Sequence, residues 1–478
     1  MDSNRYYQYL NHSQSPLRVN QFWFYHHEPG LNRSFDEAYK LMGKLDRERN
    51  VAKYASRVAL CFSTTTPTIN VHERNVQYID DIKKKDGKLI FTDGCDTMSK
   101  QLLDDIQKQL GKRPFSAIQF RYAGAKGVVS VDTRLGNDHH LCIRPSLLRN
   151  NDARNLLDEK LSNWFLPYGE KIDSIREPFF RQLLIAACLS SVRELLRRTR
   201  IRVSLNKARN MFGIIDEYNL LKPDEVFIQY TRLNDHEDKE KNDKCQNTRI
   251  LSNCKVVITK NPCHHPGDIQ TFTAVNREEL KHLKDVIVFS QPGDCPASHQ
   301  INESDLNGDE YAVIWYEDLV PLQIPNAVPF DYDSQKALPE LDRPVNQDDI
   351  NHVVLQIAES DYLGRLPNLH LAYTDSYGVD SNERPNKDVL STLILAGVIS
   401  FGVDSGQTGQ HPLDNNQIRK QKKALRDERP DFMENANMKS YPSKKYLINI
   451  HFKSILERNK KENLKYNGNC KNLEISLV

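Results

Sequence analysis

Residues 304–311 carry the clearest potential for chemistry. Asp305, Asn307 and Asp309 recur at every second position. Gly308 lies among them and allows a tight turn. Such a turn can direct three side-chain oxygens toward one hard cation such as Mg²⁺. An ordinary polar turn before a strand is the alternative interpretation, because Asp, Asn and Gly are common turn formers.

The same segment does not match a calcium-binding EF-hand loop. Such a loop needs glycine at its sixth position and glutamate at its twelfth. Counted from Asp305, these positions are Glu310 and Tyr316, and an apolar run typical of a strand follows the turn. An EF-hand is therefore excluded.

A second segment, 257–268, concentrates cysteine, histidine, proline and glycine. A zinc site here would recruit Cys254, Cys263, His264 and His265. Zinc ligands usually come from paired knuckles such as Cys-x₂-Cys, and the chain has none, which argues against zinc. The prolines and glycine favour a rigid loop that carries polar groups to a site.

Basic residues gather in two places. The first is a run of seven cations with one acid among them: Arg193, Arg197, Arg198, Arg200, Arg202, Lys207 and Arg209. A solvated helix end and a strip that contacts phosphates both account for this run. The second is the pair Arg121 and Lys126 on either side of Gly124, which are either phosphate contacts or ordinary charges on a strand face.

Composition limits the function classes. The 478 residues are 38% hydrophobic and carry a net charge of +2, which excludes wholesale disorder and a simple polybasic binder. The longest apolar stretch, 389–403, is too short for a transmembrane span and contains polar residues. The nine cysteines are scattered and odd in number, which favours a reducing compartment. We expect an intracellular protein, cytoplasmic or nuclear, without a membrane partner.

The elements that must position these residues follow from hydrophobic periodicity. Strands are predicted at 88–94, 117–132, 225–230, 255–262, 285–294 and 310–316. Helices are predicted at 99–111, 177–200, 348–360 and 389–403. The charged stretch 234–247 is typical of a surface insertion, and residues before 86 mix short strands and helices.

Taken in order, these segments resemble the eukaryotic RNA-dependent RNA polymerases of the RNA-silencing type. The matching strings lie at 62–68, 91–95, 120–122, 124–129, 143–146, 212–217, 225–229, 259–263, 265–268, 305–309 and 429–434. One such string alone would be a weak signal, whereas the ordered set is highly specific.

The resemblance implies an α+β fold with two double-psi β-barrels that face each other, together with connecting and flanking helices. It implies five regions: an N-terminal slab-like region at 1–86, a first barrel-like domain at 87–176, a helical connector at 177–211, a second, active-site barrel-like domain at 212–330, and a helical C-terminal region at 331–478.

The resemblance also implies a function. It predicts nucleotidyl transfer with Mg²⁺, or alternatively Mn²⁺, on a single-stranded RNA template with nucleoside triphosphates, and Argonaute or helicase proteins as partners by analogy with the family. Asp305 and Asp309 match the outer aspartates of the family's metal-binding Asp-x-Asp-Gly-Asp loop, with Asn307 between them as a further ligand, and Lys126 matches a catalytic lysine. The expected contacts with RNA or nucleotide are Arg121, Lys260, Arg197, Arg198, Arg200 and Arg209.

The sequence departs from the family pattern at the loop itself. Asn307 replaces the middle aspartate, and the segment before the loop, 294–304, is a few residues short. Activity is therefore expected to be reduced. A catalytically impaired paralogue that binds RNA or scaffolds a silencing complex is the alternative function.

Overall fold

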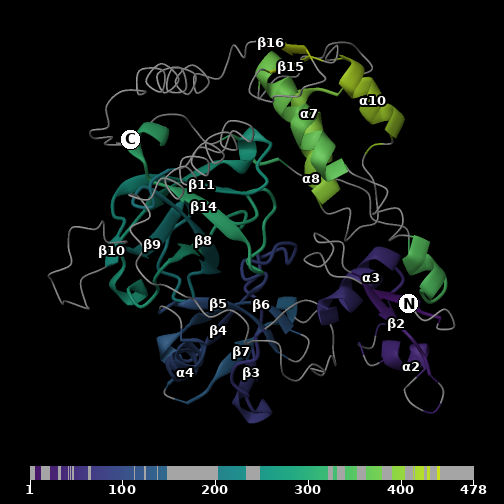
Figure 1. Cartoon of the computed structure of the whole chain (residues 1–478). Coiled ribbons are helices and arrows are strands. Elements are labelled where there is room, and N and C mark those ends of the chain that lie inside the picture. The colour runs from purple at the N-terminus through teal and green to yellow at the C-terminus, as the bar shows by residue number, and fades with distance from the viewer. Residues whose placement is uncertain are drawn as a thin grey trace, which may run out of the picture. The chain divides into compact units, whose positions relative to one another are not determined.

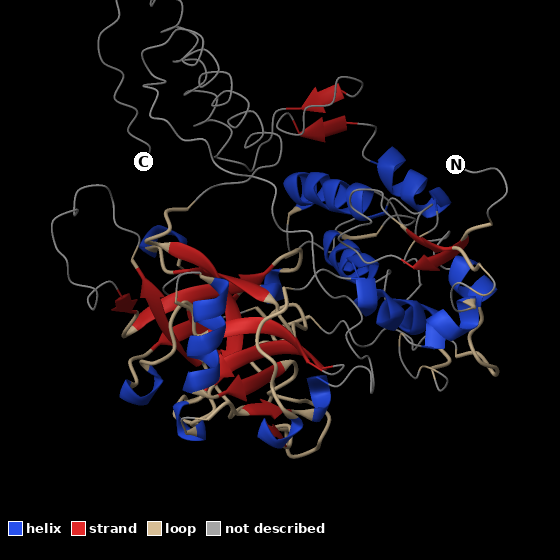
Figure 2. Ribbon diagram, turned by 60° about the horizontal axis from the view of Figure 1, so that its bottom comes forward, coloured by secondary structure: helices blue, strands red, loops and turns tan. Residues whose placement is uncertain are grey.

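The structure is a computed structural model with a mixed α+β fold (Figures 1 and 2). It describes residues 6–11, 22–28, 30, 34–40, 42, 45, 48–62, 66–111, 114–122, 125–136, 138–147, 203–232, 248–320, 327–330, 340–352, 362–378, 390–403, 413, 415–424, 428–430 and 439–441. The chain divides into two compact units, one formed by residues 1–159, 203–363 and 396–412 and the other by 160–202, 364–395 and 413–478.

Short elements make up the beginning of the first unit, as the sequence predicts. Their bounds are β1 (Gln8–Asn11), β2 (Trp23–Tyr25), α2 (Phe35–Lys40) and α3 (Val51–Ala59). The strands β1 and β2 are antiparallel. Helix α3 buries Val58 completely.

A five-stranded sheet follows, which we call the first sheet (Figure 1). Its strands are β3 (Val76–Tyr78), β4 (Cys95–Met98), β5 (Ala117–Tyr122), β6 (Ala125–Val131) and β7 (Leu141–Ile143), in the order β3-β7-β4-β6-β5. The β3–β7 and β4–β6 pairs are parallel, and the β4–β7 and β5–β6 pairs are antiparallel.

Helix α4 (Lys100–Leu110) joins β4 to β5, and its predicted ends are confirmed. Ser99 caps its first turn by accepting a hydrogen bond from the backbone of Leu102, and Gly111 ends it in the left-handed conformation at φ +58°. Leu102, Leu103 and Ile106 form its buried face, which is the apolar face that the helical spacing predicts.

One predicted strand is wrong. Residues 88–94 form a single bridge, from Ile90 to Lys83, and then a turn, so that β4 begins only at Cys95. The turn is fixed by the Thr92 hydroxyl, which accepts from the backbone of Ile82. Gly94 follows at φ +85°, a conformation that interrupts a regular strand.

The second sheet closes into a barrel, which we call the ring. Its strands are β8 (Ala208–Ile215), β9 (Glu225–Thr231), β11 (Cys254–Lys260), β12 (Gln270–Ala274), β13 (Val286–Phe289) and β14 (Glu310–Ile314), with β10 (Thr248–Ile250) added at β9. Closure comes from the pairing of β13 with both β8 and β9. The four strands predicted in this part of the chain are confirmed as β9, β11, β13 and β14, although β13 ends at Phe289. Two further strands that were not predicted, β8 and β12, complete the six-stranded closed barrel.

Large side chains fill the ring. Phe227, Phe272, Phe289 and Tyr311 are at most 2% exposed. The rings of Phe289 and Tyr311 meet edge to face with centroids 5.1 Å apart. This packed interior holds β14, and hence the segment that precedes it, in one position.

The remaining helices and strands are α7 (Tyr362–Tyr377), α8 (Thr392–Val403), α10 (Asn415–Ala424), β15 (Glu428–Pro430) and β16 (Lys439–Tyr441). The apolar run predicted as a helix at 389–403 is confirmed by α8. Within the second unit, the Tyr373 hydroxyl of α7 donates to the backbone of Gln421 in α10. Across the described residues, no helix is both long and apolar enough to cross a membrane.

Three predicted features lie outside the described residues: the helix at 177–200, the charged insertion at 234–247 and most of the helix at 348–360.

Candidate active site

Residues 305–309, which we call the aspartate loop, form a tight turn directly before β14. Asp305 Oδ1 accepts a hydrogen bond from the backbone N of Asn307 at 2.9 Å. Asp309 Oδ2 accepts from the backbone N of Asp305 at 3.2 Å. Gly308 has φ +90°, which only glycine adopts readily. The loop folds back on itself, and the three predicted ligands belong to one turn.

The loop faces a lysine from a neighbouring strand. Lys260 Nζ, at the end of β11, lies 2.6 Å from Asp309 Oδ2. Both side chains are about three-quarters buried, with 23% and 24% of their surface exposed. Burial raises the pKa of the Asp309 carboxyl, and the charge and hydrogen bond of Lys260 act in the opposite direction. Burial has the larger effect, so the pKa of Asp309 stays above its ordinary value, and the Lys260 ammonium only offsets part of this rise.

The donor set of the loop fits Mg²⁺. It offers two carboxylates and one amide oxygen, which are hard ligands of the kind that Mg²⁺ prefers. Within the described ranges, no group of three or more His, Cys, Asp or Glu residues could hold a metal ion, so a metal bound by this loop would need the amide oxygen of Asn307 beside the two carboxylates. An amide contributes less to a magnesium site than a third carboxylate would.

The first sheet supports the loop from the other side. The backbone N of Leu306 donates to the carbonyl of Asp93 at 2.6 Å. Gly94 lies so close that a Cβ there would be 2.4 Å from the backbone N of Asn307. Gln119 Nε2, on β5, donates to the carbonyl of Asn307 at 3.5 Å. The loop is therefore held between the ring and the first sheet.

Arg121 and Lys126 lie directly opposite each other on β5 and β6. Arg121 is two residues beyond Gln119, so strand alternation places both on one face of β5. Lys126, as the cross-strand partner of Arg121, lies on that same face. The predicted basic pair thus shares a face with the glutamine that reaches the aspartate loop.

The basic run is placed only in part. Arg197, Arg198 and Arg200 lie outside the described residues. Arg209 Nη1 lies 3.2 Å from Asp285 Oδ1, and its guanidinium lies 4.8 Å from the centre of the Tyr230 ring. These contacts on the ring account for the position of Arg209 without RNA.

Residues 261–268, which follow β11, form a loop that ends in a short helix, in keeping with the prolines and glycine of this segment. His265 Nδ1 accepts from the backbone N of Gly267 at 3.0 Å, and Asp268 accepts from the backbone of His265 at 3.1 Å. The backbone carbonyl of Pro262 accepts from Asn302 Nδ2 at 2.9 Å. The imidazole of His265 thus caps a short helix, and the segment contacts the chain that leads into the aspartate loop.

A buried ion pair also joins the first sheet to the ring. Arg144 Nη1 and Nη2 each lie 2.9 Å from a carboxylate oxygen of Glu217. The Arg144 backbone N donates to Asp96, which is fully buried in β4. Burial raises the pKa of Asp96 to about 7, against the opposing effect of Arg144.

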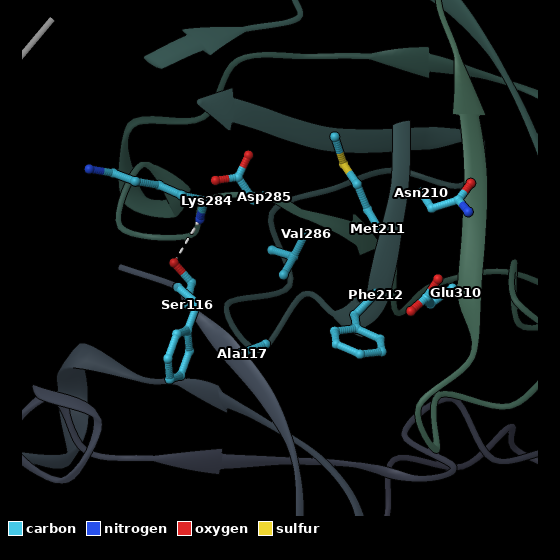
Figure 3. Close-up of a pocket in the computed structure, with 10 residues that line it drawn as sticks. Ser116, Ala117, Asn210, Met211, Phe212, Lys284, Asp285, Val286 and Glu310 are labelled. Carbon is cyan, nitrogen blue, oxygen red and sulfur yellow. Dashed lines mark hydrogen bonds between the residues drawn. The ribbon is translucent and has the colours of Figure 1, made fainter. Parts of the chain in front are cut away.

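A cavity of about 260 Å³ lies where β5 meets the ring (Figure 3). Figure 3 shows the backbone N of Lys284 donating to the Ser116 hydroxyl on one side of the cavity. Phe212 and Glu310 line the opposite side. The Lys284–Ser116 distance is 2.8 Å. Glu310 follows Asp309 directly, so the cavity adjoins the start of β14.

Sequence reasoning missed the contacts that hold the loop. Gln119 carried no signal, because a glutamine in a strand has no distinctive pattern. Gly94 lay within a string that matches the family, and a glycine in a predicted strand is a usable sign of close backbone approach. Lys260 was predicted to contact RNA or nucleotide, and its pairing with Asp309 was not foreseen.

Comparison with known proteins adds to this geometry. The family described as RNA dependent RNA polymerase matches residues 3–161 and 147–453. The probable RNA-dependent RNA polymerase 1 of Oryza sativa subsp. japonica is 28% identical, over 92% of this chain and 63% of its own length. The RNA-dependent RNA polymerase 1 of Schizosaccharomyces pombe is 26% identical, over 92% of this chain and 41% of its own length.

Among solved structures, the RNA dependent RNA polymerase QDE-1 from Thielavia terrestris has the same fold, with a TM-score of 0.66 at 18% identity. It matches 97% of this chain and 63% of that protein. The chain thus spans between 41% and 63% of the length of these relatives. Because the family match extends over nearly the whole sequence, the chain belongs to the RNA dependent RNA polymerase family.

Proposed function

We propose that this chain is an RNA-directed RNA polymerase that synthesises complementary RNA on a single-stranded RNA template in RNA silencing. The observation that carries the proposal is the position of the aspartate loop directly before β14 of the ring, where it pairs with Lys260 and lies against Gly94 in the turn before β4. Nucleoside triphosphates are the co-substrates, and pyrophosphate is the leaving group.

Asp305, Asn307 and Asp309 would hold Mg²⁺, with Mn²⁺ as the alternative. When bound, the metal supplies Lewis-acid activation of the attacking 3′-hydroxyl and stabilises the leaving pyrophosphate. Lys260 limits the negative potential at Asp309. Lys126 neutralises charge that develops on the transferred phosphoryl group.

In this proposal the ring is the second double-psi barrel, and the first sheet, whose described strands run from β3 to β5 without a closing pair, belongs to the first. The ring contains two parallel strand pairs, β9–β12 and β8–β13, and the first sheet contains the parallel pairs β3–β7 and β4–β6. The regions are 1–86, 87–176, 177–211, 212–330 and 331–478, with the second barrel-like domain carrying the metal.

RNA or nucleotide would be bound by basic residues around this site. We assign this role to Arg121, Lys260, Arg197, Arg198, Arg200 and Arg209. Argonaute or helicase proteins are the partners that family analogy indicates.

A second function is favoured by one observation. Asn307 occupies the centre of the aspartate loop, is 8% exposed, and replaces the carboxylate that the family pattern has there. A protein with a weakened metal site but an intact fold would bind RNA or scaffold a silencing complex without turnover.

Nucleotide incorporation by the purified full chain on single-stranded RNA, with Mg²⁺ or Mn²⁺, tests the proposal. Asp309→Asn should abolish incorporation, because it removes one of only two carboxylates. Glu310→Gln is the matched control, since it removes the adjacent but exposed carboxylate and should leave incorporation unchanged. RNA binding without incorporation under either metal would favour the scaffold.

A further inference from the structure

Tyr311 lies two residues beyond the aspartate loop and points into the ring. It is completely buried and packs against Phe289. Gly213 leaves room for it, because a Cβ there would lie 2.5 Å from the Tyr311 ring. The tyrosine is thus held by the packed core, and its hydroxyl has a fixed position.

The Tyr311 hydroxyl reaches the first residue of the loop. It donates to the backbone carbonyl of Asp305 at 3.0 Å and lies 2.8 Å from the Ser304 hydroxyl. The Ser304 hydroxyl donates to the carbonyl of Ser298 at 2.6 Å. Because Ser304 donates its only proton to Ser298, its oxygen can only accept from Tyr311. The single Tyr311 proton is therefore shared between the Ser304 oxygen and the Asp305 carbonyl.

The hydrogen bond from Tyr311 acts on a turn, residues 302–308, whose backbone conformation is not the one these residues would adopt most readily by themselves. Asn302, Glu303 and Gly308 have positive φ angles, so the turn depends on its surroundings to keep its shape. Fixing the Asp305 carbonyl fixes the adjoining peptide planes and so restricts the direction of the Asp305 side chain. A metal ligand held in this way loses less freedom on binding.

We propose that the Tyr311 hydroxyl is the positioning group that orients Asp305 for a divalent cation. This inference rests on the proposed function, in which the aspartate loop holds the metal. Tyr311 touches neither metal nor substrate in this role, because it acts through the backbone of Asp305.

Mn²⁺ titration of the full chain, followed by the electron paramagnetic resonance signal of the free ion, tests the inference without catalysis. Tyr311→Phe keeps the ring and removes the hydroxyl, and it should weaken Mn²⁺ binding by about tenfold. Tyr122→Phe removes a hydroxyl that also donates to a backbone carbonyl, that of Val71, and should leave Mn²⁺ affinity unchanged.

Ser304→Ala separates positioning from general loosening of the core. It removes one buried hydroxyl, as Tyr311→Phe does, but it leaves the Tyr311 proton to Asp305. Thermal unfolding should therefore show similar losses for the two variants, while Mn²⁺ affinity falls much more for Tyr311→Phe. If Tyr311→Phe unfolds, 4-fluorophenylalanine at position 311 fills the volume without a donor, and the same loss of affinity is expected.

Two results would overturn the inference alone: equal Mn²⁺ affinity in the wild type and Tyr311→Phe, or equal loss of affinity in Tyr311→Phe and Ser304→Ala. Asp309→Asn tests the underlying site. If that variant binds Mn²⁺ as well as the wild type, the loop is not the metal site, and both the proposed function and this inference fail.

Discussion

Gly94, in the turn directly before β4, and Asn307 of the aspartate loop are in direct backbone contact. A Cβ on Gly94 would lie 2.4 Å from both the backbone N and the Cβ of Asn307, and Gly94 has φ +85°. The metal-binding turn that we propose is therefore shaped in part by the turn that leads into β4 of the first sheet.

Gly94→Ala should destabilise the chain and weaken Mn²⁺ binding together. The loss in the free energy of unfolding combines about 1 kcal/mol from strain in the left-handed backbone conformation with about 1–3 kcal/mol from overpacking. Gly111→Ala is the control, because Gly111 has φ +58° with open space around its Cβ and suffers the strain alone. Urea unfolding measures the loss of stability, and Mn²⁺ titration measures the loss of affinity. Equal losses of both quantities in Gly94→Ala and Gly111→Ala would show that the contact between Gly94 and Asn307 does not shape the loop.

Lys260→Met should tighten Mn²⁺ binding several-fold at pH 8 and slow nucleotide incorporation. The ammonium lies 2.6 Å from Asp309 and opposes a second cation there, so its removal leaves a more negative site. Lys255→Met, on the same strand with an exposed ammonium bonded to Thr273, should change neither quantity. Weaker Mn²⁺ binding in Lys260→Met would show that the lysine supports the loop instead.

Asn307→Asp should lower the Mg²⁺ concentration needed for half-maximal incorporation. A third carboxylate binds Mg²⁺ better than an amide does, but without metal it repels Asp305 and Asp309. The thermal midpoint should consequently fall in metal-free buffer and recover with saturating Mg²⁺. Asn276→Asp, an exposed substitution away from the loop, should show no such dependence on metal. A variant that stays inactive would point to segment 294–304, which the family resemblance predicts to be a few residues short, as the main defect.

Lys126→Met should reduce the rate of nucleotide addition by roughly 100-fold with little change in RNA affinity, if the lysine acts on developing charge. Single-turnover incorporation and RNA binding by filter retention measure the two quantities separately. Arg121→Met, its cross-strand neighbour, should instead weaken RNA binding. A loss confined to RNA affinity in Lys126→Met would assign it a binding role.

Asp96→Asn should gain stability relative to the wild type as the pH rises from 5 to 8. Burial raises the pKa of Asp96 to about 7, with Arg144 acting in the opposite direction and with Glu217 and Asp81 adding to the rise. An unfolded aspartate titrates near about 3.9. The folded state therefore binds this proton more tightly, and the free energy of unfolding falls as the pH rises through this window.

Urea unfolding at pH 5, 6, 7 and 8 measures this slope. Asp132→Asn is the control: although burial acts upward, the hydrogen bonds from Arg134 lower the pKa of Asp132 overall. The Asp132 carboxyl of the wild type is then ionised above pH 5 in both the folded and the unfolded state. The difference in the free energy of unfolding between Asp132→Asn and the wild type should therefore stay constant over this range. A constant difference for Asp96→Asn as well would mean that Asp96 is ionised throughout.

Local patterns in the sequence predicted local structure well. Ser99 and Gly111 mark the ends of α4, and apolar runs predicted four strands of the ring, β9, β11, β13 and β14, but not β8 or β12. The predicted strand at 88–94 failed because Thr92 bonds back to Ile82 and turns the chain, a contact that periodicity does not encode.

Pairings between distant residues could not be predicted from spacing. Lys260 meets Asp309 because β11 and β14 are antiparallel with Lys260 opposite Tyr311, and this register depends on the closure of the whole ring. The same holds for Arg209, whose partner Asp285 is 76 residues away along the chain. Residue type indicated which groups could do chemistry, and topology decided which of them meet.

The Arg144–Glu217 pair has a consequence for folding during synthesis on the ribosome. Arg144 precedes Glu217 by 73 residues, so a ribosome adding about 5–20 residues per second makes the arginine roughly 4–15 s before its carboxylate. During that interval Arg144 has the carboxylate of Asp96 nearby but lacks its bidentate partner Glu217. The bidentate pair can form only after translation has passed Glu217, so this contact between the first sheet and the ring is completed late in folding during synthesis.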